Sequence, residues 1–321
     1  MTPGSPCLVG DIGGTHARFA LVVRGQVQLN AIGVLPCKDY ATLAEAIAAY
    51  LQRTGTPRVH EACLAVAAPA QNHDVQMTNN HWRFNTGQIR EHFGWSSFRV
   101  VNDFVAMALG VPHVGGEQLV PVCGGPGDSR RPRLVMGPGT GLGVSALIPA
   151  SGGYLPLITE GGHVDYAPTT ERDIHVLRIL RRRFGRVSAE RVLCGEGLLN
   201  LYQAHAEIQG LAAPLASPER VSAAALKGSC PLALEALQHF CEILGRTAGN
   251  AVLTQGSFGG VYLCGGMLPK FLDFFLASPF QEGFEDKGRM RSLQESTPVY
   301  VVTEPTTGLL GAAVALSQGS D

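Results

Sequence analysis

Two short glycine-rich turns constrain the fold of this chain more than any other feature. They are Gly10-Asp11-Ile12-Gly13-Gly14-Thr15 and Gly137-Pro138-Gly139-Thr140-Gly141-Leu142-Gly143. Each lies between two apolar runs, so each predicts a tight turn that joins adjacent strands. Glycine lets backbone N–H groups gather around an anion, and the threonines add hydroxyl donors. Two such turns in one chain predict two lobes that hold one polyphosphate from opposite sides.

A carboxylate at a strand end lies between the two turns in the sequence. The apolar run Val100-Val101 is followed by Asn102 and Asp103. Ligands of α/β sheets bind at the ends of strands, where such a side chain emerges. The turns and this carboxylate together indicate phosphoryl transfer, which needs donors for the phosphates, a metal ion and a group that orients the nucleophile.

Length and composition limit the other possibilities. The chain has 321 residues, enough for two domains with cores of their own, and its formal net charge is -1. That charge gives no general attraction to nucleic acid or to an anionic membrane. No apolar stretch approaches the ~20 residues of a membrane span, and no signal-peptide pattern opens the chain. Eight cysteines are scattered without a Cys-x-x-Cys pair, so we expect a soluble, reduced, cytoplasmic protein.

The order of apolar runs and breakers repeats once along the chain. Strands are expected at 8–11, 18–23 and 27–34, followed by alternating helices and strands that include a helix at 86–93. A second set of three strands is expected at 133–137, 144–148 and 154–158, again with a glycine turn after the first. The glycine- and proline-rich segment 112–132 is interpreted as a connection, with the crossing between domains near its start. The sequence lacks the P-loop, the dinucleotide-binding and the common hydrolase motifs.

Asp11 is the expected metal-side carboxylate. It ends the first strand beside the first turn, where a bare carboxylate would repel phosphate unless a divalent cation lies between them. We therefore predict that Asp11 binds Mg²⁺ through water. The alternative is an aspartate that caps the backbone of its own turn.

Asp103 is the expected catalytic base. Asn102 beside it can donate and accept hydrogen bonds at once, which suits a polyhydroxy substrate. The alternative for Asp103 is the N-cap of the helix predicted from 103 to 109. The sequence alone does not separate the two roles.

Two further polar clusters are candidates for substrate contact. Glu160-Gly161-Gly162-His163-Val164-Asp165 combines polar side chains with glycines that let the backbone approach a ligand. A sugar contact is favoured there, and metal binding by Glu160 and His163 is the alternative. Glu190 taken alone would be a solvated residue in a helix's first turn. The arginines at 178, 181, 182, 183 and 186 are interpreted as the solvated side of a helix whose apolar stripe is Ile174, Leu177, Leu180 and Phe184.

The chain resembles the bacterial glucokinases of the hexokinase–actin–chaperone ATPase superfamily over nearly its full length. The motifs that carry the resemblance are Gly10 to Arg18, Met77-Thr78-Asn79 with Trp82, Asn102-Asp103-Phe104, Gly139 to Gly143, Glu160 to Asp165, Ser188 to Leu193, Gly259-Gly260-Val261, Cys264-Gly265-Gly266, Phe284 to Arg289 and Gly308-Leu309-Leu310-Gly311. Each is weak alone, and their order and spacing together are specific.

The resemblance implies an α/β protein of two ribonuclease-H-like lobes with a central cleft. It implies a small lobe of residues 1–112 plus 303–321 and a large lobe of residues 113–302. The implied activity is glucose phosphorylation at the 6-hydroxyl with ATP and Mg²⁺. The implied assembly is a homodimer in the cytoplasm, without nucleic-acid or membrane partners.

The resemblance also implies roles for particular residues. Those matching the hexose contacts are Asn102, Asp103, Glu160, His163 and Glu190, with Asp103 as the base. Those matching the nucleotide contacts are Gly10, Asp11, Ile12, Gly13, Gly14, Thr15, Gly139, Thr140, Gly141, Gly265 and Gly266, the last two near adenosine.

Two departures from the family pattern stand out. His16 lies where the family usually has Asn, and an imidazole is bulkier and titrates near neutrality. Glu196 lies between Gly195 and Gly197, where a small uncharged residue is more usual. The competing interpretations are a kinase of another hexose and a catalytically weak sugar-sensing regulator.

Overall fold

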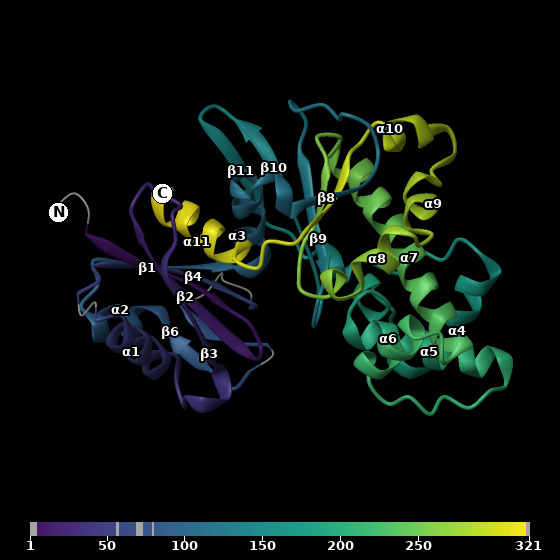
Figure 1. Ribbon diagram of the computed structural model, residues 1–321, viewed down its shortest axis with the longest axis horizontal. Coiled ribbons are helices and arrows are strands. Elements are labelled where there is room, and N and C mark those ends of the chain that lie inside the picture. Colours follow the sequence, from purple (N-terminus) through teal and green to yellow (C-terminus); the bar gives the residue numbers. More distant parts are fainter. Residues whose placement is uncertain (1–4, 56–57, 69–72, 79, 319–321) are drawn as a thin grey trace. The chain divides into compact units, whose positions relative to one another are not determined.

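The computed structural model describes residues 5–55, 58–68, 73–78 and 80–318 (Figure 1). Asn79 of the Met77-Thr78-Asn79 motif lies outside these residues. The chain divides into two compact units. The first unit comprises Met1–Gly116, Tyr154–Pro156 and Glu304–Asp321, and the second comprises Glu117–Gly153 and Leu157–Thr303.

A five-stranded sheet in the order β3-β2-β1-β4-β7 forms the centre of the first unit. Its strands are β1 (Pro6–Ile12), β2 (His16–Val23), β3 (Asn30–Pro36), β4 (Glu61–Val66) and β7 (Ser97–Asn102). The first three form an antiparallel meander, and β4 and β7 join β1 in parallel. Because β1 ends at Ile12 and β2 begins at His16, the predicted turn between adjacent strands is confirmed.

Helices and a small hairpin complete the first unit. They are α1 (Leu43–Thr54), β5 (Asp74–Gln76), β6 (Arg83–Asn85), α2 (Thr86–Phe93), α3 (Asp103–Gly110) and α11 (Thr307–Ser317). The predicted helix at 86–93 is confirmed at both ends. It begins where the Asn85 side chain accepts from the Gln88 N–H, and it ends at Gly94, whose φ is 65°. Phe19 of β2 packs on Tyr50 of α1 in the core, with ring centroids 5.3 Å apart.

The last helix, α11, packs closely against α3 and β1 of the same unit (Figure 1). Glycines make this approach possible. A Cβ at Gly311 of α11 would overlap the carbonyl oxygen of Ala106 in α3, and one at Gly110 would overlap that of Thr307. The start of α11 therefore lies beside the end of β1, where a Cβ at Gly308 would be 3.0 Å from the Asp11 carboxylate.

The second unit repeats the arrangement of the first. Its strands belong to a six-stranded sheet with the order β11-β10-β9-β12-β13-β8, in which Tyr154–Pro156 of β11 are grouped with the first unit. The strands are β8 (Leu119–Cys123), β9 (Arg133–Pro138), β10 (Leu142–Ala150), β11 (Gly153–Leu157), β12 (Val261–Leu263) and β13 (Val299–Val302). A meander led by β9 is followed by the parallel strands β12 and β13, as β1 is followed by β4 and β7. The predicted repeat of a meander with a glycine turn is confirmed.

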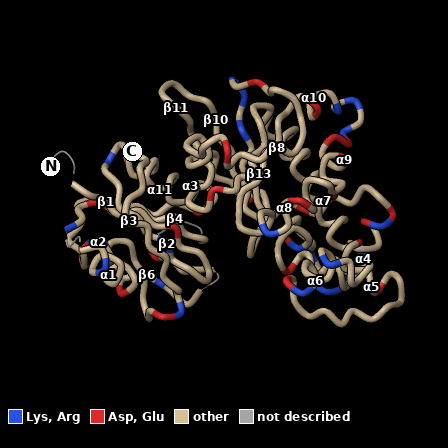
Figure 2. Tube along the Cα trace, in the orientation of Figure 1, with Lys and Arg blue, Asp and Glu red and all other residues tan. Residues whose placement is uncertain are grey.

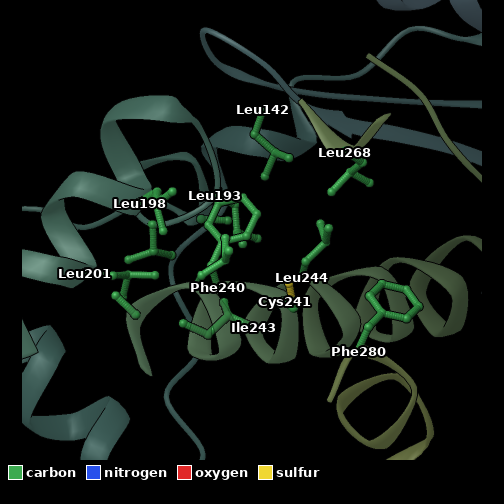
Figure 3. Close-up of a cluster of buried hydrophobic side chains, with 14 of the residues drawn as sticks. Leu142, Leu193, Leu198, Leu201, Phe240, Cys241, Ile243, Leu244, Leu268 and Phe280 are labelled. Atoms are coloured by element: carbon green, nitrogen blue, oxygen red, sulfur yellow. The ribbon is translucent and has the colours of Figure 1, made fainter. Parts of the chain in front are cut away.

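The long helix α7 (Pro231–Gln255) packs against α5 (Gly195–Gln209), α6 (Pro218–Leu226) and α9 (Phe280–Glu285) in the second unit. The other helices of this unit are α4 (Glu171–Phe184), α8 (Leu272–Leu276) and α10 (Arg291–Glu295). Figure 3 shows Phe240, Leu244 and their neighbours on α7 in one buried cluster with Leu193, Leu198 and Leu142. Because Leu142 begins β10, this core supports the second glycine turn directly.

Of two sequence-based expectations about the second unit, one is wrong and the other is right only in part. Segment 112–132 is more than a connection, because β8 within it pairs with β13 as a strand of the sheet. The apolar stripe predicted for α4 holds at Leu180, which is buried, and at Leu177, which packs against the core, but Phe184 is 37% exposed. The buried positions are Asp173, Val176, Ile179 and Leu180. Asp173 takes one of these buried positions because its carboxylate is paired there with Arg246 and His239, which are buried as well.

The charged side chains lie mostly on the surface. The five arginines of 178–186 are exposed, as expected, and Arg182 and Arg183 pair with Glu207. Figure 2 shows Lys and Arg interspersed with Asp and Glu within each unit. Among the helices in the described ranges, none combines the length and apolar character that a bilayer span requires.

Candidate active site

The first unit gathers its candidate residues at one edge of its sheet. Ile12 of β1 pairs with Val66 of β4, and Val66 pairs with Asn102 of β7. Because these three strands are parallel, their carboxyl ends meet at the same edge. The structure thus brings Asp11, the first glycine turn and Asn102-Asp103 to one place in the fold.

Asp11 lies within β1, and its carboxylate is buried at this edge. It is 7% exposed, and its Oδ2 lies 3.5 Å from Nη1 of Arg18, its partner across the β1–β2 ladder. Removal from water raises the pKa of Asp11, and the positive charge of Arg18 opposes this rise. A position in the strand and a contact with Arg18 contradict the alternative that Asp11 caps its own turn. The carboxylate is instead held beside the first turn of α11.

The structure assigns the N-cap of α3 to Asn102, the residue before Asp103. Asn102 is the N-cap of α3, since its Oδ1 accepts from the N–H groups of Phe104 at 2.9 Å and Val105 at 3.3 Å. Asp103 is the first residue of the helix, and the alternative of Asp103 as the N-cap is wrong by one residue. Because Oδ1 of Asn102 is used by the cap, the Nδ2 amide group is the part of this side chain that can donate to other groups.

The second glycine turn is tied to the start of α5. The Gly139 N–H donates to the Gly141 carbonyl at 2.8 Å, and the Gly195 N–H donates to the Gly139 carbonyl at 2.9 Å. The N-terminal end of a 15-residue helix therefore lies next to this turn. Helix N-termini favour anions, because their N–H groups and the helix dipole point outward.

Glu190 connects its own short helix to the second turn. It lies in the 3₁₀ helix Ala189–Arg191, and its Oε2 accepts from the Leu142 N–H at 2.9 Å. A Cβ on Gly141 would lie 2.5 Å from the same oxygen, so only glycine allows this approach. The view of Glu190 as a solvated residue is wrong, because this half-buried carboxylate anchors the turn at 139–141.

The segment Glu160 to His163 lies on the beginning of β10. The glycines allow it to do so: a Cβ at Gly162 would overlap the Leu142 carbonyl oxygen, and one at Gly161 would lie 2.9 Å from Val144. The side chains of Glu160 and His163 are exposed at this position. Within the described residues, no group of three or more potential ligands could hold a metal ion.

Gly265 and Gly266 follow β12 beside the same turn. The Cys264 N–H donates to the Met136 carbonyl at 2.8 Å, and a Cβ at Gly265 would lie 3.2 Å from the Pro138 carbonyl oxygen. The φ of Gly265 is 96°, which a residue with a side chain rarely adopts. The second unit thus gathers Gly139–Gly141, Gly265, Glu190 and Glu160–His163 at one end of its sheet.

Sequence reasoning missed two supporting contacts. They are the Leu142 N–H that holds Glu190 and the Gly195 N–H that holds the Gly139 carbonyl. Both are backbone groups, which no residue type identifies. The Cys194-Gly195-Glu196-Gly197 run gives a partial signal, since Cys194 caps α5 through its Sγ at 3.3 Å from the Gly197 nitrogen.

Two units with the same strand order, each with a glycine turn after its first strand, define the two-lobed class that includes the actin-like ATPases and sugar kinases. The glucokinase family model matches residues 8–319. The glucokinase of Marinobacter nauticus is 67% identical over 98% of both chains. That of Hahella chejuensis is 55% identical over 98% of both. The crystal structure of a glucokinase from an Antarctic psychrotroph, 35% identical, superposes with a TM-score of 0.88 over 98% of this chain and 99% of that one. The chain belongs to the glucokinase family.

Proposed function

We propose that this chain transfers the γ-phosphoryl group of ATP to the 6-hydroxyl of glucose, with Asp103 as the base. The family match and the relatives named glucokinase support the reaction. The observation that carries the role of Asp103 is its position directly after the cap Asn102, at the sheet edge shared with Asp11 and the first glycine turn. A base at this position takes the hydroxyl proton as the oxygen attacks phosphorus.

The sugar contacts follow from the hydrogen bonds that each side chain already makes. Asn102 uses its oxygen for the helix cap, so it donates to a sugar hydroxyl through its NH₂ group. Glu190 uses Oε2 for the Leu142 N–H, so Oε1 is the atom that accepts from a hydroxyl. Glu160 and His163 present exposed side chains from glycine-rich backbone and complete the proposed set.

The two glycine turns are the proposed phosphate-binding elements. The residues are Gly10 to Thr15 in the first unit and Gly139, Thr140 and Gly141 in the second, with Gly265 and Gly266 near the adenosine. Backbone N–H groups in glycine turns stabilise the negative charge on a transferring phosphoryl group. The N-terminus of α5 next to Gly139 adds to the favourable potential for an anion.

Asp11 fits a magnesium ion held together with ATP. Mg²⁺ usually keeps several waters and takes one or two carboxylates plus substrate phosphates, so a single buried carboxylate beside a phosphate turn suits it. Bound there, the ion supplies charge neutralisation to the phosphates. The Asp11 carboxylate, whose pKa burial raises, is stabilised in its charged form by Arg18. Homodimeric assembly and a cytoplasmic location stay predictions of the family resemblance.

A coupled assay of ADP release with Mg-ATP and a panel of hexoses tests the proposal. Asp103→Asn is compared with Asp39→Asn, which makes the same change at an exposed position of the same unit. We expect Asp103→Asn to lose about 10²- to 10⁴-fold in kcat and Asp39→Asn to keep wild-type turnover. Full turnover by Asp103→Asn would overturn its role as the base. If the wild type turns over another hexose but not glucose, the chain is a kinase of that other hexose.

A further inference from the structure

The first glycine turn is fixed from behind by side chains outside the motif. The carbonyl oxygen of Gly13 accepts from Nδ2 of Asn80 at 3.1 Å and from Sγ of Cys37 at 3.6 Å. The carbonyl oxygen of Thr15 accepts from the Cys37 N–H at 2.9 Å. The Gly13 N–H closes the turn itself by donating to the His16 carbonyl at 3.0 Å.

Asn80 lies between β5 and β6, and its side chain is held by a second hydrogen bond. Its Oδ1 accepts from the Trp82 N–H at 2.9 Å, so the orientation of the amide is fixed with its NH₂ toward Gly13. Trp82 is 1% exposed, and its indole Nε1–H donates to the Tyr40 carbonyl at 3.0 Å. The Met77 N–H also donates to the Trp82 carbonyl, at 3.1 Å. Hydrogen bonds within the chain therefore set the orientation of the donor that meets Gly13.

A fixed carbonyl also fixes the N–H group of the same peptide. The C=O and N–H of a trans peptide point in opposite directions, and the described residues contain no cis peptide. Because the Gly13 oxygen points to Asn80 and Cys37, the Gly14 N–H points to the opposite side. The Thr15 oxygen points to the Cys37 backbone, so the His16 N–H is turned away from it in the same manner.

We propose that Asn80 is a positioning residue for the nucleotide: by holding the Gly13 carbonyl, it keeps the Gly14 N–H turned toward the phosphates of ATP. This rests on the proposed function, in which the first turn binds ATP. Glycine at 13 and 14 leaves these peptides free to rotate, so without the clamp the N–H groups would have to be ordered at the moment of binding. Asn80 pre-organises the turn and does not touch the substrate.

Cys37 has a lesser part in the same clamp. The thiol is 2% exposed, and burial raises its pKa, so it stays protonated and can donate its S–H to the Gly13 carbonyl. A thiol is a weak donor, and the Asn80 amide is the stronger of the two. Loss of Asn80 is therefore expected to weaken nucleotide binding more than loss of the Cys37 thiol.

Steady-state kinetics of Asn80→Asp and Asn80→Ala test the proposal. Asn80→Asp keeps an oxygen for the Trp82 N–H but offers the Gly13 carbonyl an acceptor in place of a donor. Asn80→Ala removes the donor without adding charge. We expect the KM for ATP to rise about three- to tenfold, the effect of one hydrogen bond, with kcat and the KM for glucose within about twofold of wild type. The affinity for ADP, measured by calorimetry, should fall by a similar factor.

Trp82→Phe is the matched control, because it removes the indole donor of the same segment and leaves the Asn80–Gly13 bond in place. It should lower the unfolding midpoint without raising the KM for ATP. An unchanged KM for ATP and an unchanged ADP affinity in both Asn80 variants would overturn the proposal. So would an equal rise in Trp82→Phe, since that would assign the effect to the stability of the segment. If the wild type binds ADP but turns over no hexose, the proposed function is rejected. The role of Asn80 is then decided by the ADP affinities of wild type and the two Asn80 variants.

Discussion

Asp173→Asn is expected to destabilise the second unit strongly, although it changes only one atom of the side chain. Asp173 is completely buried. Its Oδ1 accepts from the Tyr166 hydroxyl at 2.9 Å and from His239 Nε2 at 2.7 Å. Its Oδ2 accepts from the Thr169 and Thr170 N–H groups at 3.0 and 2.9 Å, and it forms an ion pair with Arg246.

The magnitude follows from what the amide cannot do. An asparagine at 173 keeps only one acceptor oxygen. Its NH₂ group would take the place of the other oxygen and would face groups that are themselves donors. The guanidinium of Arg246, 5% exposed, would lose one carboxylate partner and keep Glu242. Removing one member of a buried ion pair costs about 3–5 kcal/mol, and a buried donor left without its acceptor costs about 1–3 kcal/mol. Because these effects overlap, we expect a loss of about 3–5 kcal/mol in the free energy of unfolding.

Urea unfolding followed by far-ultraviolet circular dichroism measures this loss. Both tryptophans, Trp82 and Trp95, lie in the first unit. Their fluorescence therefore follows the unfolding of the first unit, which does not contain Asp173. Asp165→Asn is the control: it breaks an ion pair of 2.7 Å with Arg186, but both side chains are more than half exposed. The control should cost less than about 1 kcal/mol. Equal losses in the two variants would refute the reasoning that burial decides the value of the ion pair.

Two further predictions concern stability. Burial, with the neighbouring charge of His239, lowers the pKa of His205 to about 4, so the unfolded chain binds more protons than the folded chain between about pH 6.5 and 4. Stability should therefore fall as the pH drops through this window, by about 2 kcal/mol from pH 8 to pH 5, in urea titrations at the two pH values. His205→Gln should reduce the loss of stability between pH 8 and pH 5. An unchanged loss would show that His205 is not its source. Gly311→Ala should cost about 1–3 kcal/mol, because its Cβ would overlap the Ala106 carbonyl oxygen. The control is Gly116→Ala, whose Cβ would meet nothing within 4 Å, and its free energy of unfolding in urea should stay within about 0.5 kcal/mol of wild type. Equal losses in the two variants would argue against the close packing of α11 on α3.

The elements that sequence predicted well are those whose signals are local. The helix at 86–93 carries its own cap and stop in Asn85 and Gly94. The two glycine turns carry their own strands on either side. The stripe of α4 was right at Leu180 but missed Asp173, because periodicity assigns burial to apolar residues, whereas this helix also buries Asp173 against partners from α7. The strand β8 was missed because proline and glycine around it resemble a loop, and only β13 makes it a strand.

The sequence by itself determined the type of fold and the chemistry. Glycine turns between apolar runs, repeated once, specify two meanders, because backbone freedom and strand alternation act between neighbouring residues. Tertiary structure alone decided which hydrogen bonds hold the candidate site residues. It set Asn102 rather than Asp103 as the helix cap, placed the Glu190 carboxylate on the Leu142 N–H, and aimed Asn80 at the Gly13 carbonyl. The last two contacts join residues 48 and 67 positions apart, and packing brings such partners together where no local pattern in the sequence records them.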